Sequence, residues 1–324
     1  MVNISKKNAD GIFNLIEESK TICVIGHKSP DGDCIGSVTA MYLYLKSLGK
    51  EVNCAFDGNI PYNLESFIVE DGFFNDKDKK FDLLVVMDCA DEFRLGGNMY
   101  LLDNSKHIVC IDHHKTNSSF AEYNIIIKEF SSTGELLYHL LKYGNADIDV
   151  EIATCMYVAM ITDTGKFAYA STTPDTLRVA AELLEIGVNQ SEIDNILFNS
   201  KPLKVFKAYN ALLMNTKYYF EGKLGLVKVS QEFLDEYDID FSSLDGVVSM
   251  IREVKEVEVS CVLKEKTINS VKISLRSKTG QVDVSKVCQK HGGGGHERAA
   301  GAEIGKSLLE TEKIIVDDFS EYFS

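Results

Sequence analysis

Hydrophobic positions in the first 200 residues alternate between two spacings. Residues 9–20 carry apolar side chains at helical spacing, whereas residues 21–25 form a short, continuous apolar run that is typical of a strand buried on both faces. Because strands and helices continue to alternate, we expect a parallel sheet with helices on both of its faces. Further strands are predicted at residues 52–56, 81–87 and 107–111, and further helices at residues 34–48, 131–143, 151–161, 176–185 and 191–198.

The pattern changes after residue 215, where β-rich segments predominate. We expect a first α/β domain over residues 1–199, a connecting helix within residues 200–216, and a smaller mixed α/β domain over residues 217–324. Two domains suit a chain of 324 residues. In the second domain, strands are predicted at residues 218–220, 224–229, 257–263 and 270–275, and helices at residues 232–237, 245–254 and 307–319.

Composition narrows the class of partner. The hydrophobic content of 45% suits globular domains with full cores. The formal net charge of -15 argues against a protein that coats long duplex nucleic acid, because such a protein needs a basic surface. This charge still leaves room for a small cationic pocket that binds a short anionic substrate.

Targeting and redox features point to a cytoplasmic protein. No apolar segment follows Lys6 and Lys7, so we expect no signal peptide. No stretch approaches the roughly 18 to 20 apolar residues that a membrane helix needs. The eight cysteines form no CxxC pair and several lie in apolar runs, which is typical of a reduced protein.

Acidic and imidazole side chains follow three of the predicted strands. Ligands bind beyond the carboxyl ends of the strands in parallel α/β sheets, so these side chains form one candidate site. A further aspartate lies in a Thr-Asp-Thr-Gly sequence at the end of a predicted helix. The candidate residues are His27, Asp31 and Asp33 in an H-x3-D-x-D spacing, then Asp88, then Asp112, His113 and His114, and finally Asp163.

Mixed carboxylate and imidazole ligands suit first-row divalent metals, and an oxygen-rich set favours manganese or magnesium over zinc. Clustered carboxylates repel one another unless cations lie between them. Two ions about 3.5 to 4 Å apart would relieve this repulsion, activate a water and clamp a displacement at phosphorus. Each element has a simpler alternative: a helix-capping loop for residues 27–33, a cap for Asp88, a turn for Asp163 and a polar loop for residues 112–114. Their joint occurrence favours the metal site.

A glycine-rich segment at residues 292–301, with the sequence GGGGHERAAG, is the clearest feature of the second domain. Consecutive glycines let backbone N–H groups approach an anion closely, although a flexible turn is the alternative. Arg276 could bind a phosphate through two hydrogen bonds, and Lys278 is a weaker candidate. The expected substrate-binding residues are Arg276, Lys278, Gly293, Gly294, Gly295 and His296.

Together these motifs resemble the DHH phosphoesterases, a family named for a motif present here as Asp112-His113-His114. The glycine-rich segment resembles the DHHA1 substrate domain of the same family. The resemblance implies two metal ions, usually Mn²⁺, with Mg²⁺ or Co²⁺ as alternatives, and a metal-bridged hydroxide as nucleophile. It implies that one ion is held by His27, Asp31 and Asp88, and the other by Asp33, Asp88, His113 and Asp163.

For the remaining site residues, the resemblance implies that His114 faces the scissile phosphate and that Asp112 orients the histidines. Among family members the chain resembles the bifunctional oligoribonucleases, which degrade oligonucleotides of two to five units to nucleoside 5′-monophosphates. These enzymes also dephosphorylate adenosine 3′,5′-bisphosphate (pAp). Short RNA or DNA and small phosphorylated nucleotides are therefore the expected partners, and a homodimer is left open. The alternatives are a cyclic-dinucleotide phosphodiesterase, a polyphosphate or pyrophosphate hydrolase, and a non-catalytic nucleotide sensor.

Overall fold

The computed structural model of the protein describes residues 4–244 and 246–323. Residues 1–3 lie outside the described residues, and so does Asp245, the first residue of the helix predicted for residues 245–254. The chain divides into two compact units, Met1–Ser200 and Lys201–Ser324.

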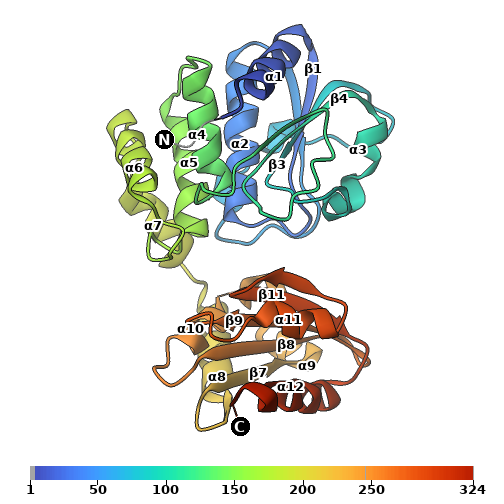
Figure 1. Cartoon of the computed structure of the whole chain (residues 1–324), viewed down its shortest axis with the longest axis vertical. Helices are drawn as coiled ribbons and strands as arrows, with labels where there is room; N and C mark the ends of the chain where they lie inside the picture. Colours follow the sequence, from blue (N-terminus) through green and yellow to red (C-terminus); the bar gives the residue numbers. More distant parts are fainter. Residues whose placement is uncertain (1–3, 245, 324) are drawn as a thin grey trace. The chain divides into compact units, whose positions relative to one another are not determined.

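The first unit is built on a five-stranded sheet with the order β2-β1-β3-β4-β5. Its strand pairs are all parallel, which confirms the predicted fold class (Figure 1). The sequence patterns predicted the first four strands but missed the fifth, which is short and only partly buried. The strands are β1 (Thr21–Ile25), β2 (Glu51–Ala55), β3 (Phe81–Met87), β4 (Ser105–Asp112) and β5 (Tyr123–Ile126).

Helices cover both faces of this sheet, but unequally. The larger core lies against α1, α2, α4 and α5 and receives alternate strand residues such as Val24 and Val85. The intervening residues, such as Ile25 and Val86, pack on the other face against α3 and the 3-10 helix η3. The helical elements are α1 (Lys6–Glu18), α2 (Gly32–Ser47), η1 (Glu65–Phe67), η2 (Glu70–Gly72), η3 (Glu92–Asn98), α3 (Tyr100–Asp103), α4 (Thr133–Tyr143), α5 (Val150–Asp163), α6 (Pro174–Ile186) and α7 (Gln190–Phe198).

Helices α2 and α5 pack unusually closely. A Cβ atom at Gly36 would lie 2.4 Å from the carbonyl oxygen of Cys155, a distance that only glycine tolerates. This close approach matters for function, because α2 carries Asp33 in its first turn and α5 ends at Asp163.

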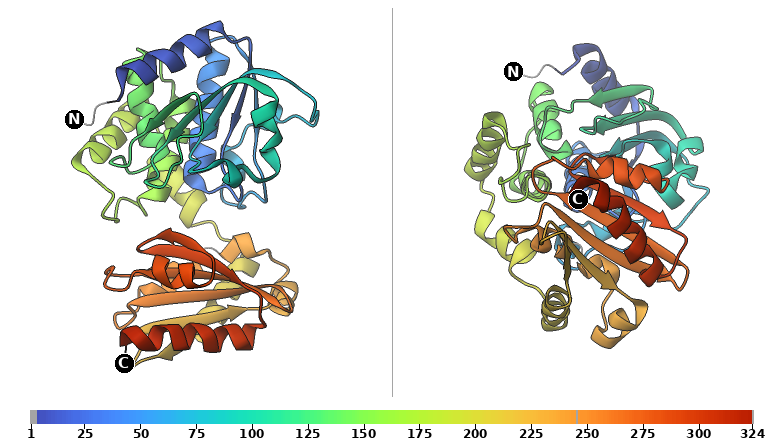
Figure 2. Two further views of the ribbon diagram at one scale, coloured as in Figure 1. Left: turned by 45° about the vertical axis from the view of Figure 1, so that its right-hand side comes forward. Right: turned by 60° about the horizontal axis from the view of Figure 1, so that its bottom comes forward.

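The second unit contains a mixed six-stranded sheet with the order β10-β11-β9-β8-β7-β6, in which β7 and β8 pair in parallel (Figure 2). The sequence patterns missed β10 and β11, because their glycine and alanine residues lack the side chains that mark a strand. The elements are α8 (Leu203–Met214), β6 (Lys217–Tyr219), β7 (Leu224–Val229), α9 (Gln231–Tyr237), η4 (Phe241–Leu244), α10 (Val247–Arg252), β8 (Val259–Thr267), β9 (Ser270–Ser277), α11 (Val284–Lys290), β10 (Gly294–His296), β11 (Ala299–Ile304) and α12 (Leu308–Phe323).

Two expectations about the environment of the chain can be compared with the structure. Within the part of the chain that the structure describes, every helix is too short or too polar to cross a membrane. All eight cysteines are buried and none forms a disulfide.

Candidate metal centre

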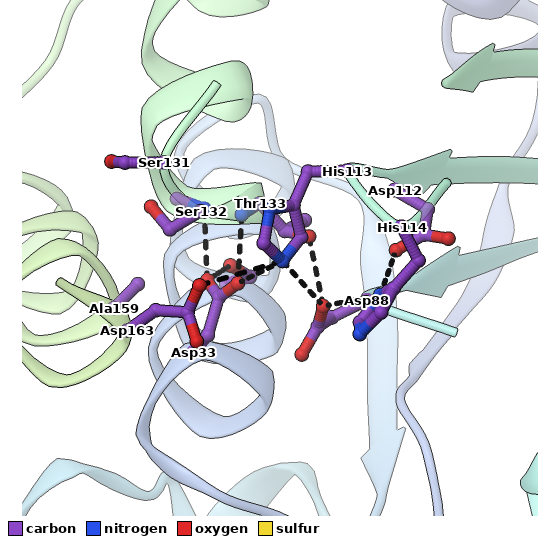
Figure 3. A network of polar contacts seen from close by, with 12 residues as sticks. Asp33, Asp88, Asp112, His113, His114, Ser131, Ser132, Thr133, Ala159 and Asp163 are labelled. Atoms are coloured by element: carbon purple, nitrogen blue, oxygen red, sulfur yellow. Dashed lines mark hydrogen bonds and ion pairs between the residues drawn. The ribbon is translucent and has the colours of Figure 1, made fainter. Parts of the chain in front are cut away.

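The carboxyl ends of β1, β3 and β4 meet at one edge of the first sheet, and the candidate residues lie there. Asp88 directly follows β3, and Asp112 ends β4. Figure 3 shows Asp33, Asp88, His113 and Asp163 pointing toward a common centre, with the start of α4 beside them.

One group of possible ligands consists of Asp33, His113 and Asp163. The Nε2 atom of His113 lies 3.5 Å from the Oδ2 atom of Asp33 and 3.6 Å from the Oδ2 atom of Asp163. One ligand atom from each of the three residues lies within 4.8 Å of the other two, a spacing that a single metal ion could bridge.

A second group consists of His27, Asp31 and Asp88. The Nε2 atom of His27 lies 3.5 Å from the Oδ2 atom of Asp88 and 3.7 Å from the Oδ1 atom of Asp31. The other carboxylate oxygen of Asp88 lies 3.8 Å from the Nε2 atom of His113, so Asp88 stands between the two groups. Asp88 also has a φ of 53°, a left-handed conformation that is uncommon outside glycine and recurs at functional sites.

The charges at this edge fit divalent cations. Burial raises the pKa of Asp33 well above its usual value, and the nearby charges of Asp88 and Asp163 raise it further. Burial likewise raises the pKa of Asp163 to about 6, against the opposing effect of His113. A cation between the carboxylates would remove this repulsion, so the residues present fit a divalent metal site.

His114 is held by a separate contact. Its Nδ1 atom lies 2.7 Å from the Oδ1 atom of Asp112. Asp112 is fully buried, and its Oδ2 atom accepts a hydrogen bond from the side-chain amide of Asn117 at 2.7 Å. The Nδ1 atom of His113 instead lies 3.3 Å from the carbonyl oxygen of Phe130. The expectation that Asp112 orients both histidines therefore differs from these contacts, in which it binds His114.

Helix capping, the simpler role considered for these aspartates, accounts for Asp31 but not for Asp88. Asp31 does cap α2, because its carboxylate accepts a hydrogen bond from the backbone N–H of Cys34. Asp91, rather than Asp88, caps the helix that follows β3. Asp163 lies at the carboxyl end of α5, where the helix dipole disfavours a negative charge. A stabilising structural role therefore does not account for Asp88 or Asp163.

Sequence patterns missed the polar groups that hold these ligands. The carboxylate of Asp33 accepts hydrogen bonds from the backbone N–H groups of Thr133 and Gly134, at 2.7 and 3.0 Å, and from the hydroxyl of Ser37 at 3.0 Å. The hydroxyl of Thr133 donates to Asp88 at 3.0 Å. The available signal was the Ser132-x-x-Glu135 pattern, which marks the start of a helix and hence a set of unpaired backbone N–H groups.

In the second unit, the sheet aligns two of the predicted substrate-binding residues. Ala299 on β11 pairs with His296 on one side and with Arg276 on the other. Side chains of directly paired residues lie on the same face of a sheet, so Arg276 and His296 share a face with only a methyl group between them. The next row of the same face contains Gly294, Gly301 and Ser274, and a Cβ atom at Gly294 would meet open space.

Two of the glycines and Lys278 also have roles in the structure of the second unit. A Cβ atom at Gly293 would lie 2.2 Å from the carbonyl oxygen of Gly301, and Gly295 has a φ of 144°. These two glycines let β10 approach β11, whereas a Cβ atom at Gly294 would meet open space. The ammonium group of Lys278 donates to the carbonyl oxygens of Val254 and Lys255, at 2.5 and 3.3 Å.

The two units correspond to two recognised domains. The profile of the DHH family, N-terminal domain, matches residues 21–160, and the profile of the DHHA1 domain matches residues 225–324. The chain belongs to the DHH family.

Individual relatives extend over most of the chain. The chain is 33% identical to the bifunctional oligoribonuclease and PAP phosphatase NrnA of Thermus thermophilus, over 87% of this chain and 84% of the relative. It is 26% identical to the enzyme of the same name from Bacillus subtilis, over 92% of this chain and 93% of the relative. A crystal structure of an exopolyphosphatase-related protein from Bacteroides fragilis has a TM-score of 0.89 and 27% identity, and the match covers 99% of this chain and 98% of that one.

Proposed function

We propose that the protein is a metal-dependent phosphoesterase that hydrolyses short oligonucleotides to nucleoside 5′-monophosphates and removes the 3′-phosphate from pAp. The convergence of His27, Asp88, His113 and their acidic neighbours at one sheet edge carries this proposal. Similarity to relatives named as bifunctional oligoribonucleases and PAP phosphatases supports the choice of substrate.

The side chains have distinct proposed roles. His27, Asp31 and Asp88 would hold one divalent cation, and Asp33, Asp88, His113 and Asp163 would hold a second. Such cations, when bound, lower the pKa of water and stabilise negative charge on a phosphoryl group. Mn²⁺ is the proposed ion because oxygen and imidazole donors suit it.

His114 would act on the substrate directly. Asp112 accepts a hydrogen bond from the Nδ1 atom of His114. Burial lowers the pKa of His114, but the hydrogen bond to Asp112 and the charge of Asp88 raise it overall, which favours the doubly protonated ring. In that form the Nε2 atom also carries a proton and can donate to a phosphate oxygen. A donor at this position would stabilise the charge that develops on phosphate oxygens during hydrolysis. The buried Asp112 carboxylate would stabilise this protonated ring and fix its orientation.

The second unit would bind a terminal phosphate of the substrate. Arg276 and His296 lie on one face of the sheet and could bind a terminal phosphate, whereas Gly294 leaves room for the anion. We propose a lesser role for Lys278, because its ammonium group is already bound to two backbone carbonyls. Gly293 and Gly295 would contribute by letting β10 approach β11 closely.

The deciding assay measures release of mononucleotide from a 5′-labelled RNA dinucleotide and release of phosphate from pAp, each with Mn²⁺ and again after EDTA. We expect both activities with Mn²⁺ and neither after chelation. Inactivity on both substrates in the presence of metal would contradict the proposal and favour a non-catalytic nucleotide sensor.

A second candidate is hydrolysis of inorganic polyphosphate, which the similarity to an exopolyphosphatase-related protein favours. Competition between polyphosphate and the dinucleotide separates the two candidates. If polyphosphate is turned over with a higher kcat/KM than the dinucleotide, the second candidate replaces the first. Cyclic di-AMP and pyrophosphate belong in the same panel, since they test the remaining alternatives.

A further inference from the structure

One short segment touches three of the proposed metal ligands. Residues 130–134, called here the 130–134 segment, connect the end of the sheet to α4. The carbonyl oxygen of Phe130 lies 3.3 Å from His113, the backbone N–H groups of Thr133 and Gly134 bind Asp33, and the hydroxyl of Thr133 binds Asp88. Any displacement of this segment would therefore move several ligands at once.

The 130–134 segment is itself held by Glu135, whose side chain is fully buried. The Oε2 atom of Glu135 accepts hydrogen bonds from the backbone N–H of Ser131 at 2.9 Å and from the hydroxyl of Ser131 at 2.5 Å. It accepts a third hydrogen bond, at 2.9 Å, from the hydroxyl of Thr176 on α6. One carboxylate oxygen thus ties the segment to a neighbouring helix.

This contact pattern differs from an ordinary helix cap. In a capping box, the glutamate would return to the backbone N–H of the capping residue, Ser132. Here Ser132 caps α4 through the N–H of Glu135, while the Glu135 carboxylate reaches one residue further back to Ser131. Burying a carboxylate is costly, so a residue that served only to begin a helix would be better placed at the surface.

We propose that Glu135 is a positioning residue for the candidate metal centre. It fixes the 130–134 segment, whose polar groups in turn hold three of the ligand side chains in place. The inference rests on the proposed metal site, and it assigns Glu135 a role in metal affinity rather than in contact with substrate. Groups that orient metal ligands typically change metal affinity or activity by about 10- to 100-fold when they are removed.

The test measures Mn²⁺ affinity by titration calorimetry at fixed pH, with the melting temperature of each metal-free variant recorded in parallel. We expect Glu135→Ala to weaken Mn²⁺ binding by about tenfold or more. Glu135→Gln keeps an oxygen that can accept the bonds from Ser131 and Thr176, so it should restore most of the affinity. At saturating Mn²⁺, Glu135→Ala should regain most of its kcat with an unchanged KM for the dinucleotide.

Glu182→Ala is the control variant. Glu182 accepts a hydrogen bond from Tyr138 and so also links α6 to α4, but it makes no such bond to the 130–134 segment. We expect wild-type Mn²⁺ affinity for this variant. Equal losses in both alanine variants would overturn the proposal, because general docking of α4 on α6 would then explain the effect.

Two further outcomes are distinguishable. If folded Glu135→Ala binds Mn²⁺ like the wild type, the positioning role is wrong while the metal centre stands. If the wild type itself binds no Mn²⁺, the proposed metal centre fails. Should Glu135→Ala not fold, Ser131→Ala removes one hydroxyl donor and keeps the backbone N–H. A smaller loss of affinity would then support the proposal, and unchanged affinity would contradict it.

Discussion

Two buried acidic centres, one in each unit, differ in how the negative charge of their carboxylates is compensated. In the second unit, Glu312 on α12 accepts hydrogen bonds from Lys217, Tyr219 and Lys228, at 2.8, 2.6 and 2.6 Å. Burial alone would raise the pKa of Glu312, but these three donors lower it to about 2. The protein therefore supplies the positive charge that this carboxylate needs.

The acidic centre of the first unit is compensated only in part. Burial lowers the pKa of His27, but its contacts with Asp31 and Asp88 raise it to about 11. The pKa of Asp88 is lowered, whereas that of Asp33 is raised well above its usual value. Asp33 and Asp88 receive hydrogen bonds from hydroxyl and backbone N–H groups, and imidazoles lie 3.4 to 3.8 Å from the carboxylates. The pKa of Asp163 is raised to about 6, mainly by burial, whereas that of Glu312 is lowered. A carboxylate satisfied by the protein is structural, and a carboxylate group left short of positive charge indicates a place for a cation.

Removing Asp88 should have the largest effect, because this side chain stands between both proposed ligand groups. We expect Asp88→Ala to lower the rate on the dinucleotide and on pAp by about a thousandfold or more, which corresponds to an activation barrier raised by roughly 4 kcal/mol. Asp82→Ala, at the opposite end of β3, should keep near wild-type activity, since Asp82 pairs with Lys106. Full activity of a folded Asp88→Ala protein would rule out the bridging role.

Arg276→Ala tests whether the cationic face of the second unit binds substrate. We expect KM for the dinucleotide to rise about ten- to a hundredfold with kcat less affected, because a charge-assisted hydrogen bond contributes roughly 1.5–3 kcal/mol. Lys278→Ala should raise KM less, since its ammonium group binds backbone carbonyls. The reverse order of the two variants would reassign the phosphate contact to Lys278.

Thr133→Val removes one hydroxyl donor from the first centre without changing side-chain shape. We expect Mn²⁺ affinity to fall by about tenfold, since this hydroxyl orients Asp88. Thr39→Val is the matched control, because the Thr39 hydroxyl is buried on α2 and has no hydrogen-bond partner among the described residues. Calorimetric titration that gave the same affinity for both variants and the wild type would remove Thr133 from the site.

Glu312→Gln should leave activity unchanged and reduce the free energy of unfolding by about 1–2 kcal/mol. The pKa of Glu312 is about 2 when folded and near 4.5 when unfolded, so its contribution is full above pH 4.5 and is lost as the pH falls toward 2. Denaturant unfolding at pH 7 and pH 3.5 should therefore show a smaller difference between variant and wild type at the lower pH. An equal difference at both values would contradict this ion network.

Sequence alone determined the positions of β1 to β4 in the first unit and the polar residues at the ends of three of them, but not β5. Residues 21–25 and 81–87 were predicted as strands with the bounds of β1 and β3, because burial on both faces leaves an unbroken apolar run within a short window. The same window places Asp88 at a strand end. The DHH family assignment, which rests on such local motifs, is shown by the family profile and by the relatives.

Tertiary structure decided which side chains meet. Asp33 and Asp163 are far apart in the sequence, and they approach the same histidine because α2 and α5 pack closely at Gly36. The anchoring of the 130–134 segment by Glu135 and Thr176 likewise joins residues 41 positions apart. The pairing of β10 with β11 and the carbonyl partners of Lys278 could not be predicted either. Glycine carries no periodic signal that would mark a strand, and long-range contacts are set by the packing of the whole domain.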